Sequence, residues 1–178
     1  MMRRGVGRGL AISAGVGVLL AGGCVVENKP SAPERERPRS VAPPRPAGVR
    51  PQQMTLSAGV GMDSDGNGYP DTIPVVVYLF ADTRRYPLPI KERGEFSFEL
   101  TAAEGVEIGS WVFGEDESAR AVGDSAAGVC YRFALRLGPG RDRLPSVPAS
   151  LRAIFTNAAT GERFASPGSA TIRIGSGE

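Results

Sequence analysis

The stretch Pro74-Val75-Val76-Val77-Tyr78-Leu79-Phe80 decides the fold of this chain. Its β-branched and aromatic residues favour a strand, and a continuous apolar run of this length is typical of a strand in the middle of a sheet. The stretch Glu95–Leu100 instead alternates polar and apolar residues, so that Phe96, Phe98 and Leu100 share one face. These two patterns predict a domain built from β-strands.

Other short apolar runs extend the pattern along the chain. Val129–Leu137 alternates like Glu95–Leu100, and glycine, proline, aspartate or asparagine separate the runs. The remaining predicted strands are Met54–Val60, Val106–Phe113, Leu151–Thr156 and Ala170–Ile174. About seven strands at this spacing predict an all-β antiparallel β-sandwich over residues 54–178, of the immunoglobulin or transthyretin type, with a barrel as the alternative. The acidic cluster Glu115-Asp116-Glu117 is expected in a solvated loop.

Composition restricts the chemistry that this chain can perform. It has no histidine, which excludes Ser-His-Asp hydrolysis, Cys-His catalysis and histidine-ligated zinc. Residues 54–178 hold 12 basic and 16 acidic side chains, so we expect no nucleic-acid partner. Of the two cysteines, Cys130 is expected to be a small buried or half-buried residue, and the fold cannot depend on a disulfide. We expect no enzyme; a hydrolase with two converging carboxylates is the remaining enzymatic alternative.

The N-terminal segment has the organisation of a secretory signal. Three arginines (Arg3, Arg4 and Arg8) precede an apolar run that ends in Leu19-Leu20-Ala21-Gly22-Gly23-Cys24. The ending resembles the lipobox of bacterial lipoproteins, in which the signal is cut before a cysteine whose sulfur carries diacylglycerol. The resemblance implies a signal peptide over residues 1–23, a covalent lipid with its acyl chains on Cys24, and anchoring to a membrane of the cell envelope.

Two other interpretations of this segment stay open. Gly9–Val26 is uncharged over 18 residues, the minimum for a spanning helix, although its five glycines disfavour one. The other open interpretation is a plain secretory signal without lipid. Ala21 stands where lipoproteins usually have Leu, Val or Ile. Val25 is not the aspartate that in related lipoproteins directs retention at the inner membrane, so the resemblance implies the outer membrane.

Residues 24–53 are expected to form a disordered linker between lipid and domain. Proline fixes φ and removes a backbone donor, so neither helix nor sheet propagates, and the tether could span roughly 80 Å if fully extended. Its arginines suggest a second role, electrostatic contact with an anionic wall or lipid surface. The prolines are Pro30, Pro33, Pro38, Pro43, Pro44, Pro46 and Pro51, and the arginines in question are Arg37, Arg39, Arg45 and Arg50.

The sharpest motif is Asp63-Ser64-Asp65-Gly66-Asn67-Gly68-Tyr69-Pro70-Asp71. Oxygen ligands at alternate positions converge on calcium when glycine lets the chain turn tightly. The nine residues resemble the calcium loops of thrombospondin type 3 repeats, which implies ligation by the side chains of Asp63, Asp65, Asn67 and Asp71 and the carbonyl of Tyr69. An EF-hand would need a glutamate where Pro74 stands. A polar turn without a metal is the alternative.

The function is expected to be that of a membrane-anchored, non-enzymatic binding or structural module. Arg84, Arg85 and Tyr86 mix cations with an aromatic ring, a combination enriched in binding hot spots, and are the candidate contact with an envelope protein or glycan. Gly68–Val77 also resembles the segment before a valine-rich strand in the type VI secretion outer-membrane lipoprotein family, which implies the alternative of a secretion-system anchor with a transthyretin-like sandwich.

Overall fold

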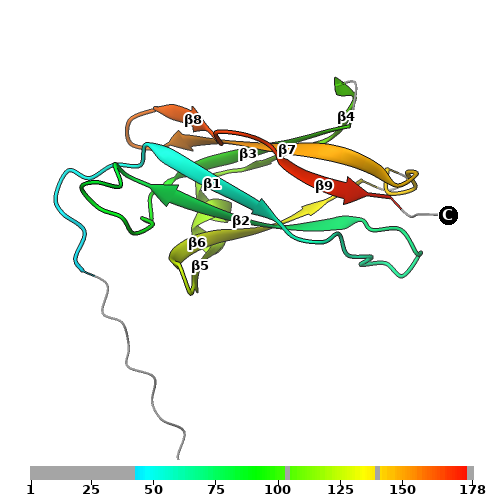
Figure 1. The fold of residues 1–178 in the computed structure, drawn as a ribbon, viewed down its shortest axis with the longest axis horizontal. Coiled ribbons are helices and arrows are strands. Elements are labelled where there is room, and N and C mark those ends of the chain that lie inside the picture. Colours follow the sequence, from blue (N-terminus) through cyan, green and yellow to red (C-terminus); the bar gives the residue numbers. More distant parts are fainter. Residues whose placement is uncertain (1–42, 103–104, 139–140, 176–178) are drawn as a thin grey trace, which may run out of the picture. The chain divides into compact units, whose positions relative to one another are not determined.

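The computed structural model describes residues 43–102, 105–138 and 141–175, which belong to one compact unit (Figure 1). These residues are mainly strands, with one short helix, and all the strand pairs are antiparallel. The strands are β1 (Gln53–Ala58), β2 (Thr72–Phe80), β3 (Gly94–Ala102), β4 (Glu107–Phe113), β5 (Val122–Ser125), β6 (Gly128–Arg136), β7 (Val147–Asn157), β8 (Arg163–Ala165) and β9 (Ala170–Ile174), and the helix is α1 (Glu115–Arg120).

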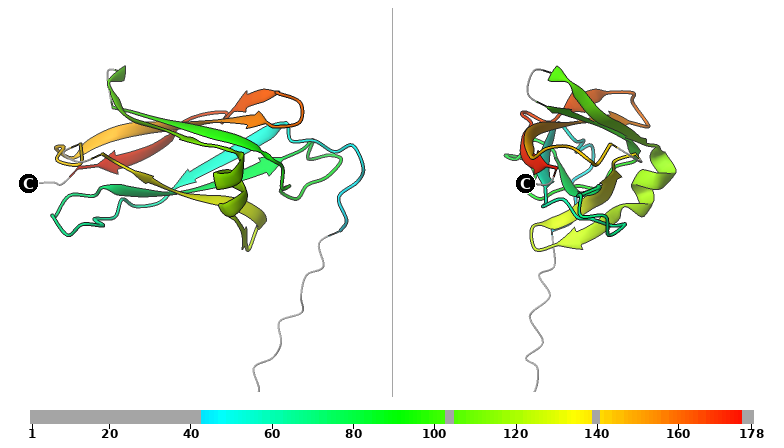
Figure 2. Two further views of the ribbon diagram at one scale, coloured as in Figure 1. Left: turned by 180° about the vertical axis from the view of Figure 1, so that it is seen from behind. Right: turned by 90° about the vertical axis from the view of Figure 1, so that its right-hand side faces the viewer.

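The strands form two antiparallel sheets that pack face to face. One sheet has the order β1-β2-β6-β5, and the other has the order β4-β3-β7, with β8 and β9 pairing along different parts of β7. The end-on view in Figure 2 shows the two layers. The prediction of an all-β protein with antiparallel sheets is therefore confirmed, and each predicted strand has a counterpart in the structure.

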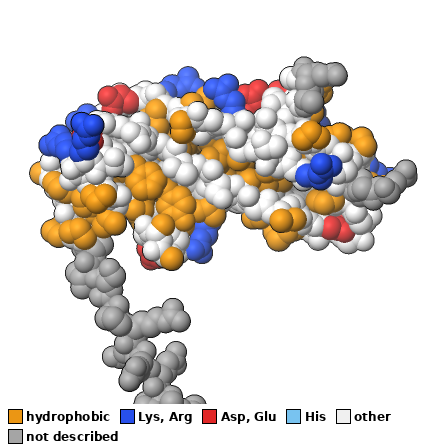
Figure 3. Space-filling view, in the orientation of Figure 1, with side chains coloured by type: hydrophobic (Ala, Val, Ile, Leu, Met, Phe, Trp, Pro, Cys, Tyr) orange, Lys and Arg blue, Asp and Glu red, His pale blue; other side chains and the backbone are white. Residues whose placement is uncertain are grey.

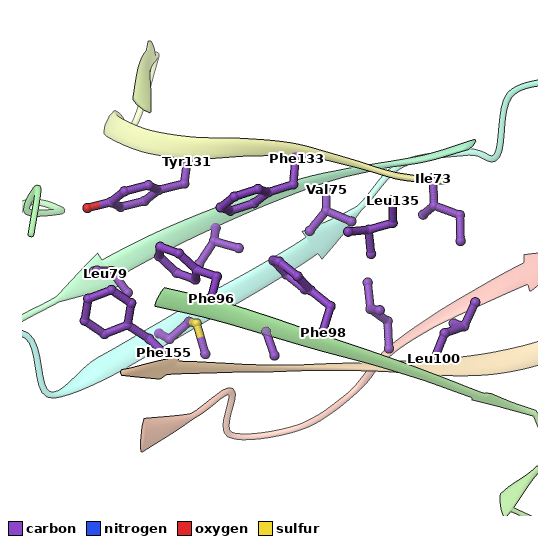
Figure 4. Close-up of a cluster of buried hydrophobic side chains, with 14 of the residues drawn as sticks. Ile73, Val75, Leu79, Phe96, Phe98, Leu100, Tyr131, Phe133, Leu135 and Phe155 are labelled. Atoms are coloured by element: carbon purple, nitrogen blue, oxygen red, sulfur yellow. The ribbon is translucent and has the colours of Figure 1, made fainter. Parts of the chain in front are cut away.

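The alternation in the sequence places the core between the sheets. Phe96, Phe98 and Leu100 of β3 are buried, as predicted, and face buried side chains of β2 and β6 (Figure 4). The Phe96 ring lies 4.7 Å from the Tyr131 ring and 4.8 Å from the Phe155 ring, measured between centroids. These contacts join both sheets through one aromatic cluster, and such pairs add about 0.5–1.5 kcal/mol each beyond the burial of apolar area.

The helix α1 corrects the expectation of a solvated loop at residues 115–117. The Gly114 N–H donates to the Glu117 carboxylate at 3.1 Å, and the Ser118 hydroxyl donates to the Phe113 carbonyl at 3.1 Å. Acidic side chains in the first turn also interact favourably with the positive end of the helix dipole. The six residues of α1 are too few to show a helical hydrophobic period, which is why the pattern did not indicate a helix.

The crossing from β4 to β5 closes one side of the domain, where α1 lies (Figure 2). Trp111 on β4 is half-buried, and its indole N–H donates to the carbonyl oxygen of Arg136 on β6 at 2.8 Å. This bond connects an edge strand of one sheet with a strand of the other. Cys130 is fully buried, as predicted, and is free of a disulfide.

Strand register assigns the connections to two ends of the domain. Gln53 lies opposite Phe80, and Gly94 lies opposite Asn157. Residues 43–52, 81–93 and 158–163 therefore lie at one end, here called the N-proximal end, which is on the left in Figure 1. Thr72 lies opposite Arg136, so residues 59–71 and the described part of 137–146 lie at the other end, here called the distal end.

Candidate functional site

Residues 43–52, which we expected within the tether, lie against the N-proximal end. The Arg45 guanidinium donates to the carbonyl oxygens of Val49 (3.0 Å) and Lys91 (3.1 Å) and to the Glu92 carboxylate (2.7 Å). Val49 is only 5% exposed and joins the core, so it ties the segment to the domain by apolar burial. Proline-rich composition correctly indicates the absence of a helix here, but it does not reveal that one valine and one arginine dock the segment.

Tyr86 holds the same segment from the other side. Its hydroxyl donates to the carbonyl oxygen of Pro43 at 3.0 Å, and the residue is 8% exposed. The three residues predicted to contact a partner therefore differ in exposure. Arg84 and Arg85 are exposed, whereas Tyr86 packs inside the domain. Ile90 of the same connection is buried in the core. Only the two arginines remain available to a partner.

The acidic loop lies at the distal end, and Asp63 organises it. One carboxylate oxygen of Asp63 accepts the Gly66 N–H at 2.7 Å, and the other accepts the Gly68 N–H at 2.7 Å. The Gly68 hydrogen bond is the main cause that lowers the pKa of Asp63, with smaller help from Gly66 and Asn67. Gly66 and Gly68 adopt φ of 76° and 86°, the left-handed region that favours glycine.

Asp71 closes the loop onto its own beginning. Its carboxylate accepts the Ser64 hydroxyl at 2.6 Å and the Ser64 N–H at 2.9 Å. These two bonds, the hydroxyl first, lower the pKa of Asp71. Tyr69 donates its N–H to the Asn67 side-chain oxygen at 2.8 Å, so the amide that we predicted as a ligand is already engaged in the turn.

A fourth carboxylate, which sequence reasoning missed, meets the loop from a distant segment. The Asn67 side-chain amide donates to the Asp142 carboxylate at 2.6 Å and to the Asp65 carboxylate at 3.0 Å. Asp142 is 5% exposed, and the Asn67 bond is the main cause that lowers its pKa. The two residues are 75 positions apart, and no local spacing signals such a contact.

The fit of this loop to calcium is partial. The chemistry of the side chains is suitable, since carboxylate and amide oxygens are the ligands that calcium takes. Among the described residues, however, no three acidic side chains converge on a common point in the way a metal site requires. The oxygens of Asp63 and Asp71 are directed to backbone and hydroxyl donors instead. Backbone donors thus already balance part of the negative charge.

A shallow groove of about 250 Å³ lies on the outer face of the second sheet. Two glutamates, Glu99 and Glu107, and the cation Arg152 line it, together with polar and apolar residues of β3, β4 and β7. Glu99 lies opposite Arg152 in the register of β3 and β7, so one of the two carboxylates has a cation as its cross-strand neighbour.

Cys24, the predicted lipid-bearing residue, lies outside the described residues, as do the signal segment and the first part of the linker. Within the described ranges, no helix has the length and apolar character that crossing a bilayer requires. In the comparisons with known proteins, no family model, curated protein or solved structure matches the chain. The case for a function therefore depends on the residues and contacts themselves.

Proposed function

We propose that this chain is a lipid-anchored protein of the cell envelope, whose two-sheet β domain serves as a non-enzymatic binding or structural module. The observation that carries the proposal is the ending Leu19–Cys24 after an arginine-rich start and an apolar run. Several acyl chains on one cysteine hold a protein stably at a bilayer, whereas a single chain binds only marginally. Outer-membrane placement follows from Val25 by the same resemblance.

The arrangement of the domain is compatible with such an anchor. The buried residues of its hydrophobic core lie between Val49 and Ile174, within the described part of the chain. The segment that leads towards Cys24 leaves from one end, where Arg45 and Tyr86 hold it. Residues 25–42 would then form the free part of the tether, with an extended reach of roughly 55 Å at the rise of polyproline II.

The anchor is tested by expressing the full chain and the Cys24→Ser variant in a bacterial host. Mass spectrometry of the mature N-terminus should find the mass of a diacylated or triacylated cysteine, and the protein should be recovered with membranes. The variant should lose the lipid and stay uncut or appear in the soluble fraction. An unmodified thiol at Cys24 in a soluble wild-type protein would refute the anchor.

Calcium binding by the distal loop is a second candidate function, favoured by the presence of Asp142 beside Asn67. Four carboxylates within one loop region repel one another, and a divalent cation would relieve the repulsion that the backbone donors leave. Asp63, Asp65, Asn67 and Asp71, the Tyr69 carbonyl and Asp142 are the groups that would hold the ion. Its role would be to order the distal end rather than to support catalysis.

Calorimetric titration of the chain from Val25 onward with calcium tests this second function. Binding should release heat and raise the melting temperature, and the Asp63→Asn variant should lose both effects. Asp124→Asn, which removes an exposed carboxylate of β5, is the matched control and should behave as wild type. Absence of heat and of a melting shift at millimolar calcium would leave the loop as a metal-free turn.

A further inference from the structure

Several basic side chains at the N-proximal end form no salt bridge with another described residue. Arg50, Arg84, Arg85, Lys91 and Arg163 are exposed, and the two salt bridges among the described residues do not involve them. Arg50 precedes β1, the next three lie in the connection between β2 and β3, and Arg163 begins β8. Figure 3 shows a group of Lys and Arg side chains at this end, on the upper left of the view, above a region of hydrophobic side chains.

Within the three connections at the N-proximal end, basic residues outnumber acidic ones. Residues 43–52, 81–93 and 158–163 contain seven basic residues and three acidic ones, whereas the neighbouring helix α1 carries Glu115, Asp116 and Glu117 against Arg120. Glu92 is bound to Arg45, and Arg93 is bound to Glu115 of α1. The Asp82 carboxylate accepts the Arg84 N–H at 3.0 Å, and the Glu162 carboxylate accepts the Thr160 hydroxyl at 3.1 Å. Within these three connections, five exposed cations therefore remain beside two acids.

The chain itself indicates what this surface meets. Residues 43–52 leave the domain at the same end, so a lipid on Cys24 would be tethered to the end that carries the basic connections. Basic residues near a membrane are attracted by anionic headgroups over about one Debye length. We propose that the N-proximal end is a docking surface for anionic phospholipid headgroups, with Arg84 and Arg85 at its centre.

This inference rests on the proposed anchor for its biological setting, but the surface acts independently of the lipid. Headgroup contact by the domain alone is expected to be weak and strongly dependent on salt. When a tether holds the domain near the bilayer, the contact between the basic surface and the headgroups becomes intramolecular. The effective concentration of the domain at the bilayer then reaches the millimolar range. The docked domain would then stand upright, with the acidic loop at the distal end pointing away from the membrane.

The test uses the chain from Val25 onward, which keeps every described residue and lacks the lipidation site. A failure of this protein to bind vesicles is therefore distinguishable from a failure of the lipid anchor. Binding to vesicles of phosphatidylglycerol and of phosphatidylcholine is measured by cosedimentation in roughly 20 mM salt, where screening is weak. We expect binding to phosphatidylglycerol alone, and its loss in roughly 0.5 M salt. Arg84→Gln with Arg85→Gln should weaken the association about tenfold, since two headgroup contacts are removed.

The matched control removes two cations at the distal end, Arg136→Gln with Arg143→Gln, and so has the same net charge as the first variant. Both pairs of arginines are exposed, and circular dichroism should show both variants folded. The control should bind within twofold of wild type. Equal losses in the two variants, or none in either, would overturn the assignment, because net charge or the linker arginines would then govern binding. Binding to an anionic polysaccharide without binding to phosphatidylglycerol would overturn it as well.

Discussion

The hydroxyl of Tyr86 donates a hydrogen bond to the carbonyl oxygen of Pro43, 43 residues earlier in the chain, across a distance of 3.0 Å. The bond joins the connection between β2 and β3 to the segment before β1. With the Arg45 contacts, it shows that the ordered domain extends at least ten residues before its first strand. Tyr86 is therefore buried where it holds the segment before β1 against the domain.

Replacing Tyr86 by phenylalanine should weaken this attachment without opening a cavity. The loss of one partly buried hydrogen bond costs about 1 kcal/mol, and the Pro43 carbonyl turns to water instead. Urea unfolding should show a midpoint shift of corresponding size. Limited proteolysis should cut near residues 43–50 faster than in wild type. The control Tyr69→Phe removes a hydroxyl that makes no hydrogen bond among the described residues, and it should change neither readout.

The Asp63–Asp71 loop should make stability depend on acid pH. The pKa values of Asp63, Asp71 and Asp142 are lowered in the folded protein by the hydrogen bonds described above. Below the ordinary value of 3.8 the unfolded chain therefore binds more protons than the folded one, and the free energy of unfolding falls as pH falls. This contribution is fully present above that value and is lost as pH passes through the lowered pKa values.

Urea unfolding between pH 6 and pH 2.5 measures this dependence. Asp63→Asn should be less stable than wild type at pH 6 and should show a smaller decrease towards pH 2.5, since a neutral amide accepts fewer of the backbone donors and does not titrate. Asp124→Asn should follow the wild-type curve. Parallel curves for wild type and Asp63→Asn would mean that Asp63 keeps an ordinary pKa.

Sequence patterns predicted the parts of this fold that bury regular faces. Polar and apolar residues alternate in β3 and β6, and β2 is an apolar run. These three strands and much of the core were therefore predictable from the sequence. β5 has four residues and β8 has three, which is too short for any period to emerge, and neither was predicted. Their pairing with longer strands, rather than their own composition, makes them strands.

The candidate sites were predictable only where the residues are close in the sequence. The acidic motif indicated a tight polar loop, and the glycines with positive φ support that conformation. Asp142 was missed because its contact with Asn67 depends on where the connection after β6 returns to the loop. Likewise, Tyr86 was interpreted as a candidate partner contact because nothing local reveals its bond to Pro43. Tertiary contacts between distant segments decide these two features.

Replacing Trp111 by phenylalanine should weaken the connection between the two sheets at the α1 side. The change removes the hydrogen bond from the indole to the Arg136 carbonyl and part of the aromatic area that covers the edge of the core. We expect a loss of about 1–2 kcal/mol, from the bond and the lost contacts together. Unfolding followed by circular dichroism avoids reliance on tryptophan fluorescence. A variant as stable as wild type would show that the bond contributes nothing.

Replacing Phe96 by alanine should destabilise the domain more than any surface change. The side chain is fully buried and contacts rings from β6 and β7, so its removal leaves a cavity between the sheets. Phenylalanine-to-alanine changes in such cores cost about 3–5 kcal/mol, against roughly 0.5 kcal/mol or less for an exposed position. The control is Val112→Ala on β4, where the side chain is 62% exposed. If urea unfolding gave similar losses for both variants, Phe96 would not be central to the packing of the two sheets.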